Sequence, residues 1–270
     1  MDLTILIPVR NDVHIKECVE SIDEKVDILV VLNNPTREVE DIVSKLDVKV
    51  AKIGEANLSK AYNYGIENAK YENVLLMDSD CTFQKGCIKK LYDGLNTAKL
   101  SKGKVVFKRN SKVSNVIAKV REFTTSDFCN AYSPPLAFKK KIVNDIGYYF
   151  DPNLRWEEDY DFNNRVIKAG LTINWIKDAE IYHPELTLFR DLRSAFNYGT
   201  GHYVGIKKGI YKEKELTKIQ RKKLISYQMK YIYMKKGYAA LLYYKVWCKA
   251  YKFGMIAQRY FIRNGLNINE

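Results

Sequence analysis

The stretch NVLLMDSD, residues 73–80, joins a short apolar run to two carboxylates. The residues before it follow the same plan, with short apolar runs that end in polar residues and amphipathic segments between the runs. We expect strands at residues 3–9, 27–32, 48–53 and 73–77. We expect helices at residues 12–23, 36–46 and 58–69. This alternation predicts a Rossmann-like α/β/α sandwich, in which a mostly parallel central sheet is covered by helices on both faces.

The residues beyond 100 predict a mixed arrangement. We expect strands at residues 105–108, 171–176 and 179–182. We expect helices at residues 111–121, 157–169, 189–198 and from about 215 to 264. A loop rich in Tyr, Ser and Pro is expected at residues 130–135, and the glycines of Gly199-Thr200-Gly201 are expected to break the helix that ends at residue 198.

Composition and charge exclude several classes of protein. The chain has 270 residues, of which 46% are hydrophobic and 29% charged, so it is neither collagen-like nor disordered. The net charge is +13, and residues 212–270 hold 14 basic and 3 acidic residues, or +11 of it. A nearly neutral body with a basic tail indicates an anionic surface partner for residues 212–270 and argues against a nucleic-acid-binding protein.

The termini and the cysteines bear on the cellular compartment. The first apolar run has no basic residues before it, and no apolar run reaches the roughly 18–20 residues that span a bilayer. Five scattered cysteines contain no Cys-x-x-Cys pair, so we expect reduced thiols rather than a zinc site or disulfides. We therefore expect a cytoplasmic protein, peripheral on the inner face of the membrane if its tail binds lipid.

The carboxylates of Asp78 and Asp80 are candidate metal ligands. Two carboxylates one residue apart at a strand end can reach one hard cation, which prefers oxygen ligands. A divalent ion there would bridge the two phosphates of a nucleotide diphosphate and neutralise charge on it as it leaves. The alternative is a solvated turn. The position after the fourth strand favours the metal site, because ligands of such sheets bind at the carboxyl ends of the strands.

A second acidic cluster spans residues 156–161, where Trp156 precedes four carboxylates. The helix dipole accounts for some of these acids, by ~0.3–1 kcal/mol each. Trp156 predicts a stacking surface for a sugar, and a carboxylate here can act as a general base. His183 ends a short expected strand and is a candidate metal ligand, with a structural histidine as the alternative.

Taken in order, these pieces resemble the family 2 glycosyltransferases with the GT-A fold. Asp78-Ser79-Asp80 is similar to the DxD motif of that family, and Glu158-Asp159 to its Glu-Asp motif. The other matching positions are 4–11, 28–31, 61–66, 75–77, 146–151, 165, 169–170, 183 and 198–201. The resemblance covers roughly residues 1–200.

The resemblance implies an inverting, hexosyltransferase-type enzyme that moves a sugar from a nucleotide diphosphate sugar, with a UDP-sugar favoured, to an acceptor hydroxyl. It implies a divalent metal, Mn²⁺ or Mg²⁺, and a GT-A catalytic domain at residues 1–211. Residues 1–100 would form the nucleotide-binding half and residues 101–211 the acceptor half, followed by the helical basic region 212–270. The signature of processive members is absent, so we expect one sugar to be added per encounter.

The same resemblance assigns roles to single residues. Asp80 is the expected main metal ligand, Asp78 contacts the ribose or the metal, and His183 completes the site. Asp159 is the expected general base, and Glu158 helps to hold the acceptor. The other expected substrate-binding residues are Pro8, Val9, Arg10, Asn33, Lys60, Ser79 and Trp156.

Two positions depart from the family pattern. Asn33-Asn34 stands where members often carry an Asp that reads the base of the donor, and an Asn oxygen can still accept from a base N–H. Tyr62 stands where members have an Arg, and Lys60 is the candidate for the missing positive charge. A catalytically silent nucleotide-sugar-binding protein is an alternative to the enzyme.

The last expected helix is amphipathic. Its basic residues Lys245, Lys249, Lys252, Arg259 and Arg263 recur at helical spacing, with aromatic and aliphatic residues on the other faces. This pattern fits a helix in a membrane interface, where each basic residue contributes ~1 kcal/mol near anionic lipid. A lipid-linked or cell-surface glycan precursor is then the expected acceptor. The alternative is a helix packed on the catalytic domain or on a second subunit.

Overall fold

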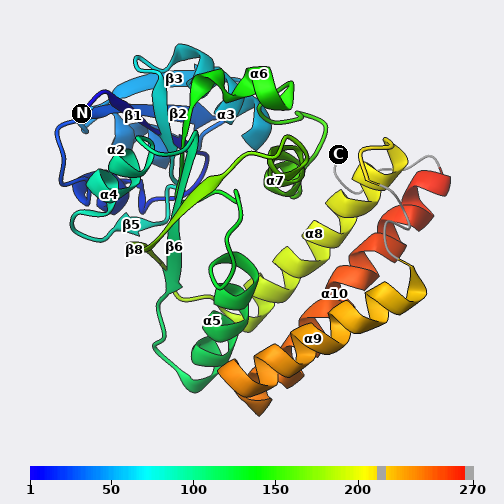
Figure 1. Cartoon of the computed structure of the whole chain (residues 1–270). Coiled ribbons are helices and arrows are strands. Elements are labelled where there is room, and N and C mark those ends of the chain that lie inside the picture. The colour runs from blue at the N-terminus through cyan, green and yellow to red at the C-terminus, as the bar shows by residue number, and fades with distance from the viewer. Residues whose placement is uncertain (212–216, 265–270) are drawn as a thin grey trace. The chain divides into compact units, whose positions relative to one another are not determined.

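The computed structural model describes residues 1–211 and 217–264, which form two compact units (Figure 1). The first unit comprises Met1–Val106, Thr125–Asn153 and Glu158–Pro184. The second takes the described residues of Phe107–Thr124, Leu154–Glu157 and Glu185–Glu270. The functional boundary after residue 211 stays a prediction.

An eight-stranded sheet has the strand order β3-β2-β1-β4-β7-β6-β8-β5. Its parallel strands are β1 (Leu3–Val9), β2 (Asp27–Asn33), β3 (Lys49–Ile53) and β4 (Asn73–Leu76). Its antiparallel pairings involve β5 (Thr82–Phe83), β6 (Leu100–Phe107), β7 (Leu136–Lys139) and β8 (Ile173–His183). The α/β fold predicted from the sequence is confirmed, and β8 is one long strand where two short ones were expected.

Helices of the first unit pack on the sheet because its central strands β1, β2 and β4 are apolar on both faces. They are α1 (Ile15–Glu20), α2 (Arg37–Val43), α3 (Leu58–Asn68), α4 (Cys87–Gly94), α6 (Val143–Ile146, after the 3₁₀ turn Lys140–Ile142) and α7 (Glu158–Lys168). Leu6 and Val74 join a core cluster with Tyr62 of α3 and Phe162 of α7. Ile5 faces the other way along β1 and is equally buried. Burial of both faces supplies the main driving force for this sandwich.

The second unit is helical. Its helices are α5 (Lys112–Thr125, whose last residue belongs to the first unit), α8 (Leu188–Lys207), α9 (Lys218–Lys236) and α10 (Tyr238–Arg263). The expected break at residues 199–201 is wrong, because these residues lie inside α8. A Cβ on Gly199 would lie 1.9 Å from the carbonyl oxygen of Tyr251, and one on Gly254 would lie 2.0 Å from that of Phe196. The glycines therefore let the backbones of α8 and α10 approach closely instead of ending a helix.

Helix α10 differs from the predicted division into a basic face and an apolar face. Trp247 and Tyr251 are half-buried and stack on each other, with ring centroids 5.9 Å apart. Apolar side chains that are exposed together with the basic residues are Leu242, Val246, Phe253, Ile256 and Tyr260. Within the described part of the chain, no helix has the length and apolar character required to cross a membrane.

Candidate active site

Asp78 follows β4 at the carboxyl end of the parallel strands. Its Oδ1 accepts a hydrogen bond from the hydroxyl of Tyr62 at 3.1 Å, and that hydroxyl lies 3.2 Å from Oγ of Ser133. Tyr62 is 2% exposed and comes from α3, so the helix and the strand hold this carboxylate together. Tyr62, which stands where members of the resembled family have an Arg, therefore has a defined role, because its hydroxyl holds Asp78.

Asp80, Cys81 and His183 form a cluster whose ligand atoms all lie within 4.8 Å of one another. The pairing of β5 with β8 explains it, because Thr82 lies opposite Tyr182 and the next position along each strand is Cys81 and His183. Nδ1 of His183 lies 2.8 Å from the carbonyl oxygen of Pro184. That oxygen can only accept, so Nδ1 carries the proton and Nε2 faces Oδ2 of Asp80 at 3.4 Å.

This cluster fits a divalent cation. The 3.4 Å between Oδ2 of Asp80 and Nε2 of His183 is a separation that one ion can span with bonds of about 2.1 Å. The hydrogen bond from His183 to Pro184 is the orienting contact that metal-binding histidines usually have. Burial, followed by the charges of Asp80 and Asp78, raises the pKa of Cys81 well above its usual value. A carboxylate oxygen and an imidazole nitrogen are both ligands that divalent ions accept.

The acidic cluster at residues 157–161 divides by the partners of its members. Asp161 is buried, and its Oδ2 lies 2.8 Å from Nε of Arg165 and 3.1 Å from the hydroxyl of Tyr148. Glu157 belongs to the second unit, where its Oε2 lies 3.1 Å from Nδ1 of His202. Glu158 and Asp159 occupy the first turn of α7, where the helix dipole favours negative charge.

The charges of Asp80 and Asp159 act on Asp78. Burial and the negative charges of Asp80 and Asp159 together raise the pKa of Asp78 to about 7, against the opposing effects of Tyr62 and Lys102. The charge of Asp159 therefore acts on a carboxylate about eighty positions earlier in the sequence, within the same unit. A strongly perturbed carboxyl group at the end of a strand is characteristic of functional sites.

The structure places three of the expected substrate-binding residues in other contacts. Oδ1 of Asn33 accepts from the backbone N–H of Asn57 at 2.8 Å, so this amide oxygen already has one partner. Lys60 forms an exposed ion pair with Glu55. Trp156 belongs to the second unit, where its ring meets that of Tyr198 edge-on at 6.4 Å.

The remaining expected donor-binding residues lie near the ends of β1 and β4. Pro8 and Val9 are buried in β1, whereas Arg10, the next residue, is exposed. Ser79 is half-buried between the two carboxylates of the Asp-Ser-Asp motif. Their contacts with a nucleotide stay predictions.

Two site residues were missed in the sequence. Cys81 follows Asp80 directly, and the apolar patterning indicated a buried thiol without a polar role. Lys102 is 1% exposed in β6, and its charge acts on Asp78 and Asp159. The sequence held one local signal for Lys102, which is its position within a predominantly apolar stretch. A lysine is rarely buried unless it is paired, so a buried position would have indicated a partner.

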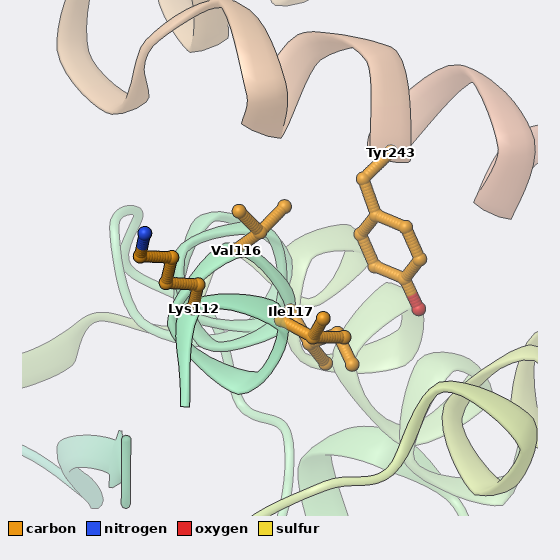
Figure 2. A pocket seen from close by; sticks show the side chains of 5 residues that line it. Lys112, Val116, Ile117 and Tyr243 are labelled. Atoms are coloured by element: carbon orange, nitrogen blue, oxygen red, sulfur yellow. The ribbon is translucent and has the colours of Figure 1, made fainter. Parts of the chain in front are cut away.

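A separate pocket of about 310 Å³ lies within the second unit, between α5 and α10 (Figure 2). Its lining consists of Lys112, Val113, Val116, Ile117 and Tyr243. The Tyr243 ring forms one wall, and its hydroxyl donates to Oδ2 of Asp191 at 2.5 Å. None of these five lining residues carries a carboxylate or an imidazole.

Comparison with known proteins identifies a family and a set of similar folds. A model described as glycosyl transferase family 2 matches residues 4–148, more than half of the chain. No curated protein matches the chain.

Crystal structures of TarS from S. aureus resemble the chain. One TarS fragment, in complex with UDP-GlcNAc, is 15% identical at a TM-score of 0.56, over 98% of this chain and 93% of that one. Another, in complex with UDP, is 17% identical at a TM-score of 0.53, and the match covers 87% of this chain and 72% of that one. A structure titled simply TarS is 18% identical at 0.54, and the match spans 87% of this chain but only 44% of that one. Likeness at these identities shows the fold.

Proposed function

Because the chain belongs to glycosyl transferase family 2, a family of glycosyltransferases, we propose that it moves one sugar per encounter from a UDP-sugar to an acceptor hydroxyl with inversion. The preference for UDP is supported by the similar fold of TarS, which was crystallised with UDP and with UDP-GlcNAc. The proposal is supported above all by one observation, the action of the Asp80 and Asp159 charges on Asp78 in the first unit.

Inversion requires a base on one face of the sugar and charge stabilisation on the other. In the proposed step, Asp159 takes the proton of the acceptor hydroxyl. The hydroxyl oxygen then forms a bond to the anomeric carbon, while the bond from that carbon to the diphosphate breaks and its electron pair leaves with UDP. Glu158, next to Asp159 in the first turn of α7, holds the acceptor.

The opposite side of the reaction belongs to the residues that follow β4. Asp80 and His183 would hold a divalent ion, which when bound supplies positive charge at the leaving diphosphate. Asp78, fixed by Tyr62, would face the ribose or the ion. Pro8, Val9 and Ser79 would line the nucleotide pocket, with Arg10 at its rim.

Nucleotide binding with and without metal tests this function. We expect UDP with Mn²⁺ to raise the melting temperature more than UDP with EDTA, and more than GDP or dTDP with Mn²⁺. Asp80→Asn should abolish the metal-dependent rise. Asp93→Asn is the matched control, because Asp93 is an exposed carboxylate paired with Lys89 on α4. Unchanged metal-dependent binding in Asp80→Asn would contradict the metal site.

Turnover separates an enzyme from a silent binder. We expect the wild type to hydrolyse a UDP-sugar slowly in the presence of Mn²⁺, because water can take the place of the acceptor hydroxyl. Metal-dependent UDP binding without hydrolysis or transfer of any UDP-sugar would favour the silent nucleotide-sugar-binding protein.

For the acceptor side, we propose that α9 and α10 bind an anionic membrane surface and that the acceptor is a lipid-linked glycan precursor. The support comes from the exposed face of α10, where apolar and basic side chains alternate. Phe253 is 64% and Ile256 54% exposed, and Lys249, Lys252 and Arg259 are exposed among them. Apolar side chains can enter the headgroup region while the basic ones contact anionic lipid, whereas a second copy of this face would repel the first.

Vesicle flotation tests this second proposal. We expect binding to vesicles with 30% anionic lipid that weakens as salt rises, and no binding to neutral vesicles. Lys249→Gln with Lys252→Gln should reduce it, whereas Lys16→Gln with Lys89→Gln removes the same charge from exposed helices of the first unit and should not. Equal loss in both pairs would contradict the assignment to α10.

A further inference from the structure

The loop at residues 130–135 connects the two sides of the proposed site. On the donor side, Oγ of Ser133 lies 3.2 Å from the hydroxyl of Tyr62, which in turn donates to Asp78. On the acceptor side, the backbone N–H of Ala131 donates to Oδ1 of Asn163 in α7 at 2.8 Å. Displacement of this loop would therefore disturb Asp78 and α7 together.

An aromatic contact also ties the loop to the turn of α7 that carries the candidate base. The ring of Tyr132 lies 6.4 Å from that of Tyr160, the residue after Asp159. Asn163, which receives the Ala131 N–H, lies one turn further along α7 and is buried. The position of Asp159 thus depends on where the backbone of the loop lies.

Lys102 holds this loop from inside the sheet. Its side chain is 1% exposed, and its Nζ donates to the carbonyl oxygens of Tyr132 at 2.5 Å and Pro134 at 2.7 Å. These two carbonyls flank Ser133, so one ammonium group fixes the backbone on both sides of the residue that reaches Tyr62. A neutral apolar side chain would leave both carbonyls without this donor.

The ammonium is also part of the electrostatics of the site. The groups that act on it are Asp159 and Asp78, which favour its charged form, followed by Cys129 and Cys81. Burial outweighs them and lowers the pKa of Lys102 to about 7. By the same interaction Lys102 favours the ionised form of Asp78. Burying a lysine costs free energy that an apolar side chain of similar size would avoid. Packing alone therefore does not account for a lysine at this position.

We propose that Lys102 is a positioning residue for the transfer reaction, which anchors the loop 130–135 and supplies a positive charge that acts on Asp159. The proposal rests on the proposed function for its reaction, but the contacts of Lys102 are independent of it. The positive charge acts through Asp159, because a general base must be ionised to accept a proton.

Three substitutions separate the charge from the anchoring contacts. Lys102→Gln keeps N–H donors for the carbonyls and removes the charge, Lys102→Met removes both, and Lys102→Arg keeps both. Lys140→Met is the matched control, because Lys140 also donates to a backbone carbonyl, that of Ala69, outside the proposed site. Urea unfolding shows which variants are folded before activity is compared.

The kinetic readout is kcat as a function of pH. We expect the acid limb of the profile to move up by about one pH unit in Lys102→Gln, with kcat at pH 6.5 falling about tenfold and the donor KM staying within about twofold. Lys102→Met should show the same shift and a further loss at every pH, because the loop is no longer anchored. Lys102→Arg and Lys140→Met should keep the wild-type limb.

A second readout needs no turnover. The Asp159 carboxyl can be followed by ¹³C NMR in metal-free protein labelled at Asp, with its signal assigned by its absence in Asp159→Asn. We expect it to titrate at higher pH in Lys102→Gln than in the wild type. This result without any sugar transfer would refute the proposed function and leave the action of Lys102 on Asp159 intact.

The proposal fails if Lys102→Gln leaves both the Asp159 titration and the acid limb unchanged. If kcat falls by the same factor at every pH, and only in Lys102→Met, Lys102 has an anchoring function alone. That result would overturn the proposed action of its charge on Asp159. If neither neutral variant folds, the wild type is compared with Lys102→Arg, in which the positive charge is permanent. We expect the Asp159 signal of the wild type to shift near pH 7, where Lys102 loses its proton, and this shift to be absent in Lys102→Arg. Identical titration curves in the two proteins would contradict the coupling.

Discussion

Each unit of the molecule buries charged side chains, but their surroundings differ. In the second unit, Nε of Arg121 lies 3.4 Å from Oδ1 of Asp191, whose Oδ2 accepts from Tyr243 at 2.5 Å. Burial opposes the charge of Arg121, but Tyr198 and Asp191 outweigh it and raise its pKa. In the first unit, burial dominates instead and moves the pKa of Asp78 up to about 7 and that of Lys102 down to about 7.

The difference separates a structural charge from one that is available for chemistry. Arg121 and Asp191 each have an opposite charge in contact, and the pair holds α5 to α8 within the second unit. Asp78 has two like charges acting on it and accepts from the uncharged hydroxyl of Tyr62, so its ionised form is held at a cost. A bound cation or ligand would remove this unfavourable free energy, so the ionised carboxylate favours binding.

The largest expected effect concerns turnover in the first unit. Asp159→Asn should lower kcat by about 10²–10⁴-fold, because the amide cannot accept the proton of the acceptor hydroxyl. UDP binding with Mn²⁺ should stay near the wild-type value, as measured by calorimetry. Asp161→Asn, two residues along α7, should reduce stability through its lost ion pair with Arg165 more than it reduces kcat. Retained turnover in Asp159→Asn would assign the base to another residue.

In the second unit, we expect substitution of a buried charge to lower the stability of the protein rather than its turnover. Asp191→Asn leaves the buried Arg121 without its opposite charge and should lower the free energy of unfolding by about 3–5 kcal/mol. Urea unfolding followed by circular dichroism measures this loss. Replacing both partners, as Arg121→Met with Asp191→Leu, should recover much of it. A change in metal-dependent UDP binding by the folded single variant would break the comparison, because it would give this pair a functional role.

Close packing in the second unit has a smaller effect. Gly199→Ala places a Cβ 1.9 Å from the carbonyl oxygen of Tyr251, so α8 and α10 must separate at a cost of about 1–3 kcal/mol. Gly54→Ala is the control, because its Cβ meets no atom within 4 Å and should change stability by less than about 0.5 kcal/mol. Thermal unfolding of both variants checks this. Equal stability would show that the helices have room at Gly199.

The smallest expected effect has the opposite sign. The pKa of Asp78 is about 7 in the folded protein and 3.8 in the reference state, so the folded state retains the proton as pH rises and is penalised once the proton is lost. Asp78→Asn removes the penalty and can still accept from Tyr62. In EDTA it should be more stable than the wild type at pH 8.

That gain should shrink as pH falls from 7 to below 3.8, where the wild-type carboxyl is protonated in both states. Urea unfolding at several pH values measures the difference. Adding Mn²⁺ should stabilise the wild type and leave Asp78→Asn less affected. A constant difference across pH would show that Asp78 is not the titrating group.

Local patterns in the sequence were sufficient for several parts of this molecule. Asp78 and Asp80 could be placed at the end of a strand because an apolar run precedes them, and a sheet brings such ends to one edge. The pair of Asp161 and Arg165 is also local, because residues four apart meet on one face of a helix. In these cases the distance along the chain fixes the distance in space.

Other parts depended on contacts between distant residues. His183 meets Asp80 only through the register of β5 with β8, and the glycines of α8 looked like breaks because their reason is the backbone of α10. Lys102 looked like an ordinary charged residue, and its carbonyl acceptors lie about thirty residues away.

The sequence by itself determined the alternation of strands and helices, the family and the acidic residues, because each follows from short-range periodicity or from motif order. Only the tertiary structure decided which acidic residues are neutralised and which are available. That distinction depends on desolvation and on the charges within a few ångströms, and neither is encoded in the spacing of residues along the chain.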